Sequence, residues 1–209
     1  LDALSPRLFA QGRRRDEVAR PGLARQGREV IQRLLDGLVV QGLAGQFVLL
    51  PSWIDLARID TFAAAHEHAA LRRKHGLDPA AVLVVNIGTV CERKGQHTFL
   101  QAATLLRDEL LRLCPGRGVR FVVVGARPGL YLDALRQEAA LTGLDLVDFV
   151  PETPDIHDFY RLADVFVCTS FEESFPRVIL ESAGYRLHIV TTNVNGIGEM
   201  LTDEDAWLV

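Results

Sequence analysis

The sequence has 209 residues, of which 48% are hydrophobic and 24% are charged, an ordinary globular composition that suffices for one sizeable domain. Its formal net charge of −4 gives no electrostatic case for a nucleic acid partner. We see no signal peptide and no apolar stretch long enough to span a bilayer. Three scattered cysteines without a CxxC pair, Cys91, Cys114 and Cys168, favour a reducing compartment. We expect a cytoplasmic protein, and peripheral association with the inner face of the membrane stays open.

Residues 1–46 differ in composition from the remainder of the chain. Residues 1–33 carry eight arginines and four acidic residues, and we interpret this basic stretch as a solvated surface, with a phosphate- or membrane-facing patch as the alternative. Arg25 to Val40 has the spacing of an amphipathic helix. We expect residues 1–46 to be a partial N-terminal segment that is helical or poorly ordered, and residues 47–209 to form one domain.

Short apolar runs predict the strands of that domain. Most are near-continuous Val, Ile and Leu, which is typical of a parallel sheet buried on both faces. The predicted strands are Phe47 to Leu50, Val82 to Ile87, Val119 to Val124, Leu146 to Val150, Val165 to Cys168, Ile189 to Thr192 and Trp207 to Val209.

Helical spacing alternates with these runs from Val82 onward. The predicted helices are Thr61 to Lys74, Gln96 to Leu113, Leu130 to Leu141, Ile156 to Ala163, Pro176 to Tyr185 and a short one after Gly196. Alternating strands and helices indicate an α/β fold with a Rossmann-like, doubly wound parallel sheet. Ligands of such sheets bind beyond the carboxyl ends of the strands.

The first loop at that edge is GTVCERKG, residues 88–95. Gly88 follows a strand and permits a tight turn, while Arg93 and Lys94 place positive charge where a helix begins. The backbone N–H groups of a helix start favour an anion. A surface basic pair at a loop end is the alternative, and the spacing of a P-loop is absent.

The loop VVVGARPG, residues 122–129, also follows a strand. It lacks the GxGxxG spacing of dinucleotide-binding proteins, so an ordinary turn that needs glycine explains it equally well.

The stretch EESFPRVILE, residues 172–181, follows the strand that ends at Cys168. Pro176 suits the first turn of a helix, and the free N–H groups of residues 174–178, a range that includes Val178, would face a diphosphate. Glu173 precedes the helix, and Glu181 could accept hydrogen bonds from the vicinal hydroxyls of a ribose. The alternative is an exposed Arg177–Glu181 pair four residues apart.

Two further patterns are typical of metal sites, but we do not predict a metal site at either of them. On one helix, the imidazoles of His66 and His68 would point about 200° apart, so we interpret His66-Glu67-His68 as a solvated face. Asp203-Glu204-Asp205 fits a DxD pattern, but no nucleotide loop lies near it in the sequence. We interpret it as a surface turn.

In combination, these segments resemble the donor-binding, C-terminal half of retaining GT-B glycosyltransferases of family 4 (glycosyl transferases group 1). The resemblance covers about residues 47–209. It rests on GTVCERKG, on two acids separated by seven residues (Glu173 and Glu181) after Ser170, and on the V-x-G-x-x-E segment Val194 to Glu199. LLPSWIDLARI, residues 49–59, is similar to the interdomain linker of that family.

The resemblance implies roles for individual residues. Lys94 would contact the donor diphosphate and Glu173 the donor sugar, and both would be catalytic. The backbone amides of Ser174, Phe175 and Pro176 would face sugar and phosphate, while Glu181 would hold the ribose and Val150 would lie beside the base. No cofactor and no metal are implied, since the family uses cationic side chains and a helix dipole.

Several positions depart from the family pattern. Thr89 stands where many members have arginine, and Arg93 is a candidate replacement. Ser174 and Pro176 replace glycines beside Phe175. Arg186 and His188 stand where Gly and Pro are common, and Ser52-Trp53 replaces Asn-Gly in the linker.

These observations predict a retaining glycosyltransferase of the hexosyltransferase type. It would move a sugar from a nucleotide diphosphate sugar to an acceptor hydroxyl on a glycan, lipid or small molecule. The N-terminal GT-B domain would be largely missing, so we expect these 209 residues to bind nucleotide without efficient turnover. The alternatives are another GT-B enzyme, such as a sugar-nucleotide epimerase or phosphorylase, and a non-catalytic interaction module.

Overall fold

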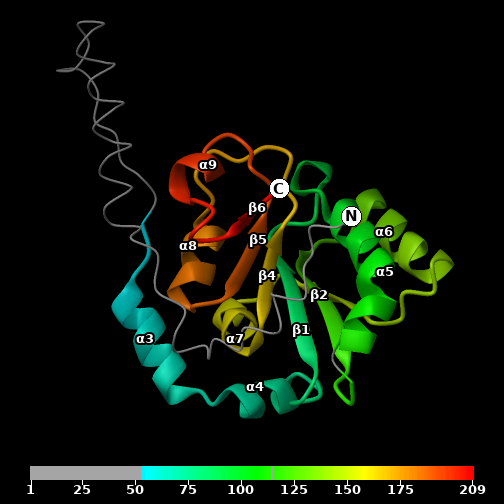
Figure 1. Ribbon diagram of the computed structural model, residues 1–209, viewed down its shortest axis with the longest axis horizontal. Helices are drawn as coiled ribbons and strands as arrows, with labels where there is room; N and C mark the ends of the chain where they lie inside the picture. Colours follow the sequence, from blue (N-terminus) through cyan, green and yellow to red (C-terminus); the bar gives the residue numbers. More distant parts are fainter. Residues whose placement is uncertain (1–52, 114) are drawn as a thin grey trace, which may run out of the picture.

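The computed structural model of the chain describes residues 53–113 and 115–209 (Figure 1). The helix predicted at residues 25–40, the strand predicted at residues 47–50 and the predicted boundary after residue 46 lie outside the described residues. No helix in the described part of the chain is long and apolar enough to cross a membrane.

One parallel sheet organises the domain. Its six strands lie in the order β3-β2-β1-β4-β5-β6, and every neighbouring pair is parallel. The strands are β1 (Val82–Ile87), β2 (Val119–Ala126), β3 (Val147–Pro151), β4 (Val165–Cys168), β5 (His188–Thr191) and β6 (Trp207–Leu208). The predicted α/β, doubly wound sheet is therefore confirmed, with strand ends that differ from the predicted ones by at most two residues.

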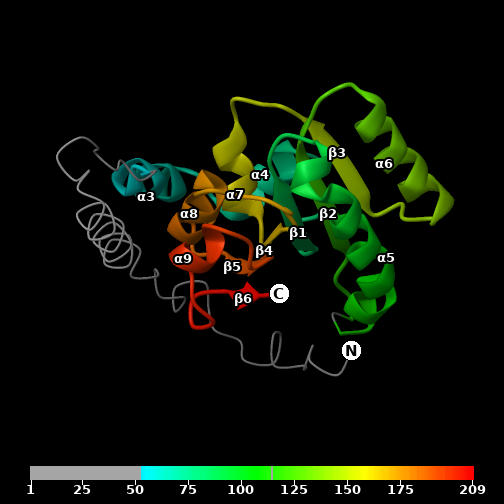
Figure 2. The same cartoon turned by 90° about the horizontal axis from the view of Figure 1, so that it is seen from above.

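Alternation along β1 explains why both faces of the sheet carry helices. Leu83 and Val85 point into one hydrophobic core, and Val82 and Val84 point into a second core on the opposite face. Successive side chains of a strand lie on opposite faces, so a strand with no polar face must be covered on both sides. Figure 2 shows α5 and α6 on one side of the sheet and α3, α7 and α8 on the other.

The helices follow the predicted order. They are α3 (Leu56–Ala65), α4 (His68–Lys74), α5 (Gln96–Leu113), α6 (Leu130–Leu141), α7 (Ile156–Leu162), α8 (Arg177–Gly184) and α9 (Ile197–Met200), with a short 3-10 helix, η2 (Glu92–Lys94). The bounds of α5 and α6 are those predicted, and the ends of α7 and α8 lie within one residue of the prediction.

The single helix predicted at residues 61–74 is wrong. Two helices, α3 and α4, occupy this region. Asp55 caps the start of α3 by accepting a hydrogen bond from the Arg58 N–H. The carboxylate of Glu67 accepts from the first N–H groups of α4, those of Ala69 and Ala70. Side-chain capping of this kind begins a helix, so Glu67 starts a second helix where the apolar spacing alone predicted a continuous one.

The sheet order places the candidate site. From β1 the chain first adds β2 and β3 on one side and then, after a reversal, adds β4, β5 and β6 on the other. Such a switch point leaves a crevice at the carboxyl ends of the two central strands, where doubly wound folds bind ligands. Here it lies between β1 and β4, and the loops that follow these strands meet above the sheet (Figure 1).

Candidate functional site

The loop after β1 lies directly against the loop after β4. Gly95, between η2 and α5, has a φ of 63°, and a Cβ there would lie 2.1 Å from the carbonyl oxygen of Thr169. The Phe171 N–H also donates to the carbonyl of Arg93 at 2.9 Å. Glycine is therefore needed at position 95 for two reasons. It adopts the left-handed conformation, and its lack of a side chain permits the close approach of the loop after β4.

Lys94 and Glu173 form the centre of this contact. The Lys94 ammonium is paired with Glu173 Oε1, and the hydroxyl of Ser170 donates to the same oxygen at 2.8 Å. The side chain of Glu173 is 7% exposed and that of Lys94 is 18% exposed. A buried carboxylate needs a counter-charge and hydrogen bonds, and these two loops supply both. The structure thus brings together the two residues that the sequence singled out as catalytic.

Arg93 also contacts the loop that carries Glu173. Its Nη1 donates to the backbone carbonyl of Glu172 at 2.7 Å and lies 3.7 Å from Glu173 Oε2. The side chain is 48% exposed, so Arg93 lies at the solvent-facing rim of this charged group. Gly88 also borders this group, since a Cβ built on it would lie 4.0 Å from the Cε atom of Lys94.

Helix α8 begins beside this charged group. Its N-cap is Pro176, which is extended and provides no side-chain hydrogen bond. The first N–H groups of a helix have no partner inside the helix, so those of Arg177 and Val178 are available to an anion. Gly196 packs directly against the loop between β4 and α8. A Cβ built on Gly196 would lie 1.4 Å from the carbonyl oxygen of Ser174.

Glu181 lies on α8 in a separate polar group. Its Oε2 accepts a hydrogen bond from the hydroxyl of Tyr160 at 2.7 Å, and its Oε1 lies 3.4 Å from Arg177 Nη2. The Arg177–Glu181 pair that the sequence offered as an alternative is therefore present, and Arg177 is exposed while the Glu181 side chain is only 16% exposed. Sequence reasoning missed Tyr160, because a tyrosine on the apolar face of a helix indicates core packing and nothing more.

Three of the apolar residues predicted for the site have intermediate exposure. Phe175, Val178 and Val150 are partly buried against the core beneath α7 and α8. Val150 lies one residue before the end of β3, which is the edge strand of the sheet.

Another cation, Arg127, directly follows β2. Arg127 pairs with Glu152 at 2.6 Å, and the hydroxyl of Thr89 donates to the same Glu152 oxygen at 3.4 Å. The position at which many members of the resembled family have arginine thus has a cation close to it, supplied by a neighbouring loop. The only sequence signal for it is one basic residue in GARPG.

Neither of the two sequence patterns that are typical of metal sites, at residues 66–68 and 203–205, forms a cluster of metal ligands in the described part of the chain. His66 ends α3, whereas His68 begins α4, so they do not share the single helix on which the orientation argument rested. Asp205 accepts hydrogen bonds from Thr202 within an exposed turn, as predicted. Within residues 53–113 and 115–209 no three His, Cys, Asp or Glu side chains are placed to hold a metal ion.

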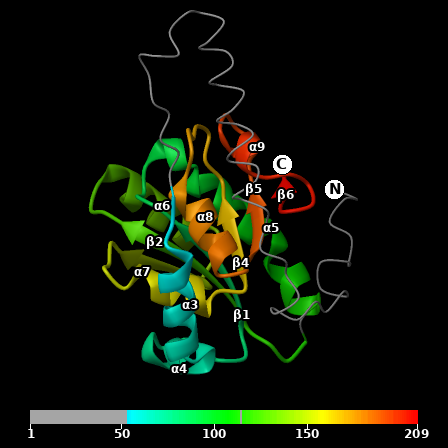
Figure 3. The same ribbon diagram turned by 90° about the vertical axis from the view of Figure 1, so that its left-hand side faces the viewer.

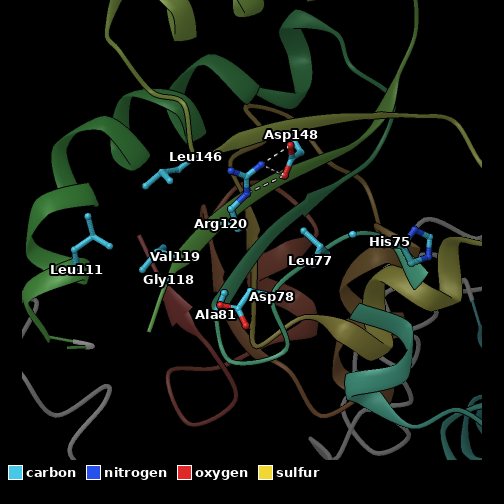
Figure 4. A pocket seen from close by; sticks show the side chains of 11 residues that line it. His75, Leu77, Asp78, Ala81, Leu111, Gly118, Val119, Arg120, Leu146 and Asp148 are labelled. Atoms are coloured by element: carbon cyan, nitrogen blue, oxygen red, sulfur yellow. Dashed lines mark hydrogen bonds and ion pairs between the residues drawn. The ribbon is translucent and has the colours of Figure 1, made fainter. Parts of the chain in front are cut away.

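A hollow of about 420 Å³ lies at the opposite end of the sheet (Figure 4). Its walls come from the starts of β2 and β3 and from the segment before β1, and they include Ala81, Val119 and Leu146. The one guanidinium that lines it, from Arg120, already donates to Asp148 at 2.6 Å. His75 and Asp78 also line the hollow, but His75 pairs with Asp158 at 2.8 Å and Asp78 accepts from the Ala80 N–H at 2.8 Å. The polar side chains named here are thus already engaged within the protein.

Residues 81–209 match the family described as glycosyl transferases group 1. Among curated relatives, a D-inositol 3-phosphate glycosyltransferase from Pseudarthrobacter chlorophenolicus is 32% identical over 156 residues, which cover 73% of this chain and 35% of that protein. The lipopolysaccharide core biosynthesis mannosyltransferase LpsB from Rhizobium meliloti is 29% identical over 180 residues, 83% of this chain and 49% of that protein. The chain thus spans a third to a half of the length of these relatives.

Solved structures show the same fold. Anabaena Alr3699/HepE, crystallised in complex with UDP-glucose, has a TM-score of 0.58 and 26% identity, covering 68% of this chain and 38% of that one. The C-terminal domain of a glycosyl transferase group 1 family protein (LpcC) from Francisella tularensis has a TM-score of 0.58 at 24% identity, covering 69% of this chain and 74% of that domain.

Proposed function

The chain belongs to the glycosyl transferases group 1 family, and we propose that its described part is the donor-binding domain of a retaining glycosyltransferase. The substrate is a nucleotide diphosphate sugar, and the product is a glycoside with the anomeric configuration of the donor. Most of the acceptor-binding surface would come from the remainder of the protein, since this chain spans about a third of its first curated relatives.

The observation that carries the proposal is the Lys94–Glu173 ion pair at the switch point. It joins a cation from the loop after β1 to a carboxylate at the entrance of α8, beside an uncapped helix N-terminus. An ammonium group and open N–H groups favour a diphosphate at this place. Without ligand, Glu173 supplies the negative charge that Lys94 needs.

In the proposed reaction, the C–O bond between the anomeric carbon and the diphosphate breaks, and the acceptor oxygen bonds to that carbon on the same face. The proton of the acceptor hydroxyl passes to the departing diphosphate. Negative charge develops on the departing diphosphate, so Lys94 and the first turn of α8 would stabilise the transition state more than the ground state. Arg93 would add charge at the rim. Glu173 would face the sugar and Glu181 the nucleoside.

A relative with ligand supports the class of substrate. Alr3699/HepE, 26% identical to this chain over the aligned part, was crystallised with UDP-glucose. We therefore propose a nucleotide-sugar donor for this chain as well and leave the identity of the base and the sugar to experiment.

The proposal is tested by calorimetric titration of the chain with UDP-glucose, GDP-mannose and ADP-glucose. We expect saturable binding of one donor and competition by its nucleoside diphosphate, but not by the free sugar. A folded chain that binds none of the three at millimolar concentration would contradict the proposal and favour an interaction module. For the complete enzyme, an NMR measurement of product configuration decides retention, since an inverted product rules it out.

A further inference from the structure

The two oxygens of Glu181 have unequal surroundings. Oε2 receives a hydrogen bond of 2.7 Å from the hydroxyl of Tyr160, whose side chain is fully buried. Oε1 lies 3.4 Å from the guanidinium of Arg177, whose side chain is 65% exposed. The first contact is short and enclosed and the second is long and solvated, so a ligand would displace Arg177 far more easily than Tyr160.

Tyr160 itself has little freedom to move. Its ring is stacked on that of Tyr185, with centroids 5.6 Å apart and planes 8° apart, and Tyr185 bonds through its hydroxyl to His157 Nδ1 at 3.0 Å. Figure 3 shows α7, which carries Tyr160, beside α8, which carries Glu181 and leads into Tyr185. The aromatic contacts therefore fix the Tyr160 hydroxyl relative to α8.

The direction of the hydrogen bond is also fixed. Burial raises the pKa of Tyr160 well above its ordinary value, and the charge of Glu181 raises it further. The hydroxyl therefore keeps its proton near neutral pH, where it donates and the carboxylate accepts.

We infer that Tyr160 is a positioning residue for ribose recognition. It anchors Oε2 of Glu181 so that Oε1 faces the crevice and accepts a hydrogen bond from the vicinal hydroxyls of the donor nucleotide in place of Arg177. This inference rests on the proposed function, because it needs Glu181 to face the nucleoside. It goes further because it makes Tyr160, a buried residue that touches no ligand, responsible for the preference for nucleotides that carry a ribose diol.

The physical basis is pre-organisation. A glutamate side chain has three rotatable bonds, and fixing them at the moment of binding costs free energy that weakens the complex. Tyr160 fixes them before the ligand arrives. Its removal should therefore weaken only those ligands that use the carboxylate, namely nucleotides that carry the diol.

The experiment uses Tyr160→Phe, which retains the stacked ring and loses the hydroxyl. The matched control is Tyr185→Phe, which removes the other hydroxyl of the stack, the one bonded to His157 rather than to Glu181. Each 209-residue chain is titrated with UDP, GDP and ADP, and then with the 2′,3′-dideoxy form of the nucleotide that the wild type prefers. Thermal unfolding establishes that both variants are folded.

For Tyr160→Phe we expect about tenfold weaker binding of the ribonucleotide and unchanged binding of its dideoxy form. Tyr185→Phe should bind both as the wild type does. Equal weakening of both nucleotides, or an undiminished preference for the diol in Tyr160→Phe, would overturn the inference while leaving the proposed function intact. A wild type that binds nucleotide without any preference for the diol overturns it too. A wild type that binds none of the three refutes the proposed function and with it this inference.

Discussion

Lys94 and Glu173 form an ion pair across the switch point of the sheet, although 79 positions separate them in the chain. The pair depends on the reversal of strand order, which brings the end of β1 beside the end of β4. A local feature of each loop becomes a site only through this topology.

Replacing Lys94 by alanine should weaken binding of a nucleoside diphosphate by roughly tenfold to a hundredfold, because a charge-assisted contact to the diphosphate is lost. Binding of the corresponding nucleoside should change little. Lys74→Ala is the control, since Lys74 also pairs with a carboxylate, that of Asp158 at 2.7 Å, but lies on α4. Calorimetric titration measures both. An equal loss for nucleoside and diphosphate would show that Lys94 does not act on phosphate.

Replacing Gly95 by alanine should destabilise the domain and loosen the site. The φ of 63° disfavours alanine by about 1 kcal/mol, and the new Cβ would meet the Thr169 carbonyl at 2.1 Å. Gly143 is the matched control, because its φ is 62° and no atom lies within 4 Å of a Cβ built there. Urea denaturation of both variants isolates the clash. If Gly143→Ala proves as costly as Gly95→Ala, the close approach of the loops does not matter for stability.

Arg72 holds the start of the sheet together and should tolerate no apolar replacement. It is buried, and its guanidinium donates to the carbonyls of Leu162, Pro79 and Ala81 and to Asp164 at 2.6 Å. Arg72→Met leaves these acceptors unpaired and should cost about 3–5 kcal/mol of unfolding free energy. The neighbouring Arg73 is 61% exposed, so Arg73→Met should cost less than about 0.5 kcal/mol. Similar unfolding midpoints for the two variants would disprove the account of Arg72.

His157 should make the folded state sensitive to mild acid. Burial lowers its pKa from the ordinary 6.5, although the charge of Glu181 opposes the shift. Because the folded-state pKa is lower than the unfolded one, the unfolded chain binds more protons as pH falls below about 6.5, and stability decreases there. Denaturation curves at pH 7 and pH 5.5 should show a smaller loss in His157→Gln than in the wild type. Identical losses would mean that His157 stays unshifted in the folded chain.

The long periodic elements could be predicted from sequence. Helix α5 spans Gln96–Leu113 and strand β1 spans Val82–Ile87, both as expected, because apolar spacing over many residues dominates local preferences. The break at Glu67 was missed since a capping carboxylate depends on two or three backbone N–H groups, not on a period.

The candidate site was predictable to the extent that topology decides it. Gly88, Lys94, Glu173 and Pro176 follow the ends of β1 and β4, and parallel strands bring such loops to one edge. The contact between Tyr160 and Glu181 was beyond reach, since it depends on how α7 and α8 are rotated against each other. The contact of both Arg127 and Thr89 with Glu152 could not be predicted either, since it depends on the length of one surface side chain.

The most direct test of the central claim is calorimetric titration of the wild-type chain and of Glu181→Ala with UDP, GDP and ADP. We expect the wild type to bind one of the three selectively and Glu181→Ala to weaken this binding by roughly tenfold or more. That result would establish a nucleotide site at the carboxyl ends of the strands and would identify the base. Binding that Glu181→Ala leaves unchanged, or no binding by a folded wild-type chain, would contradict it.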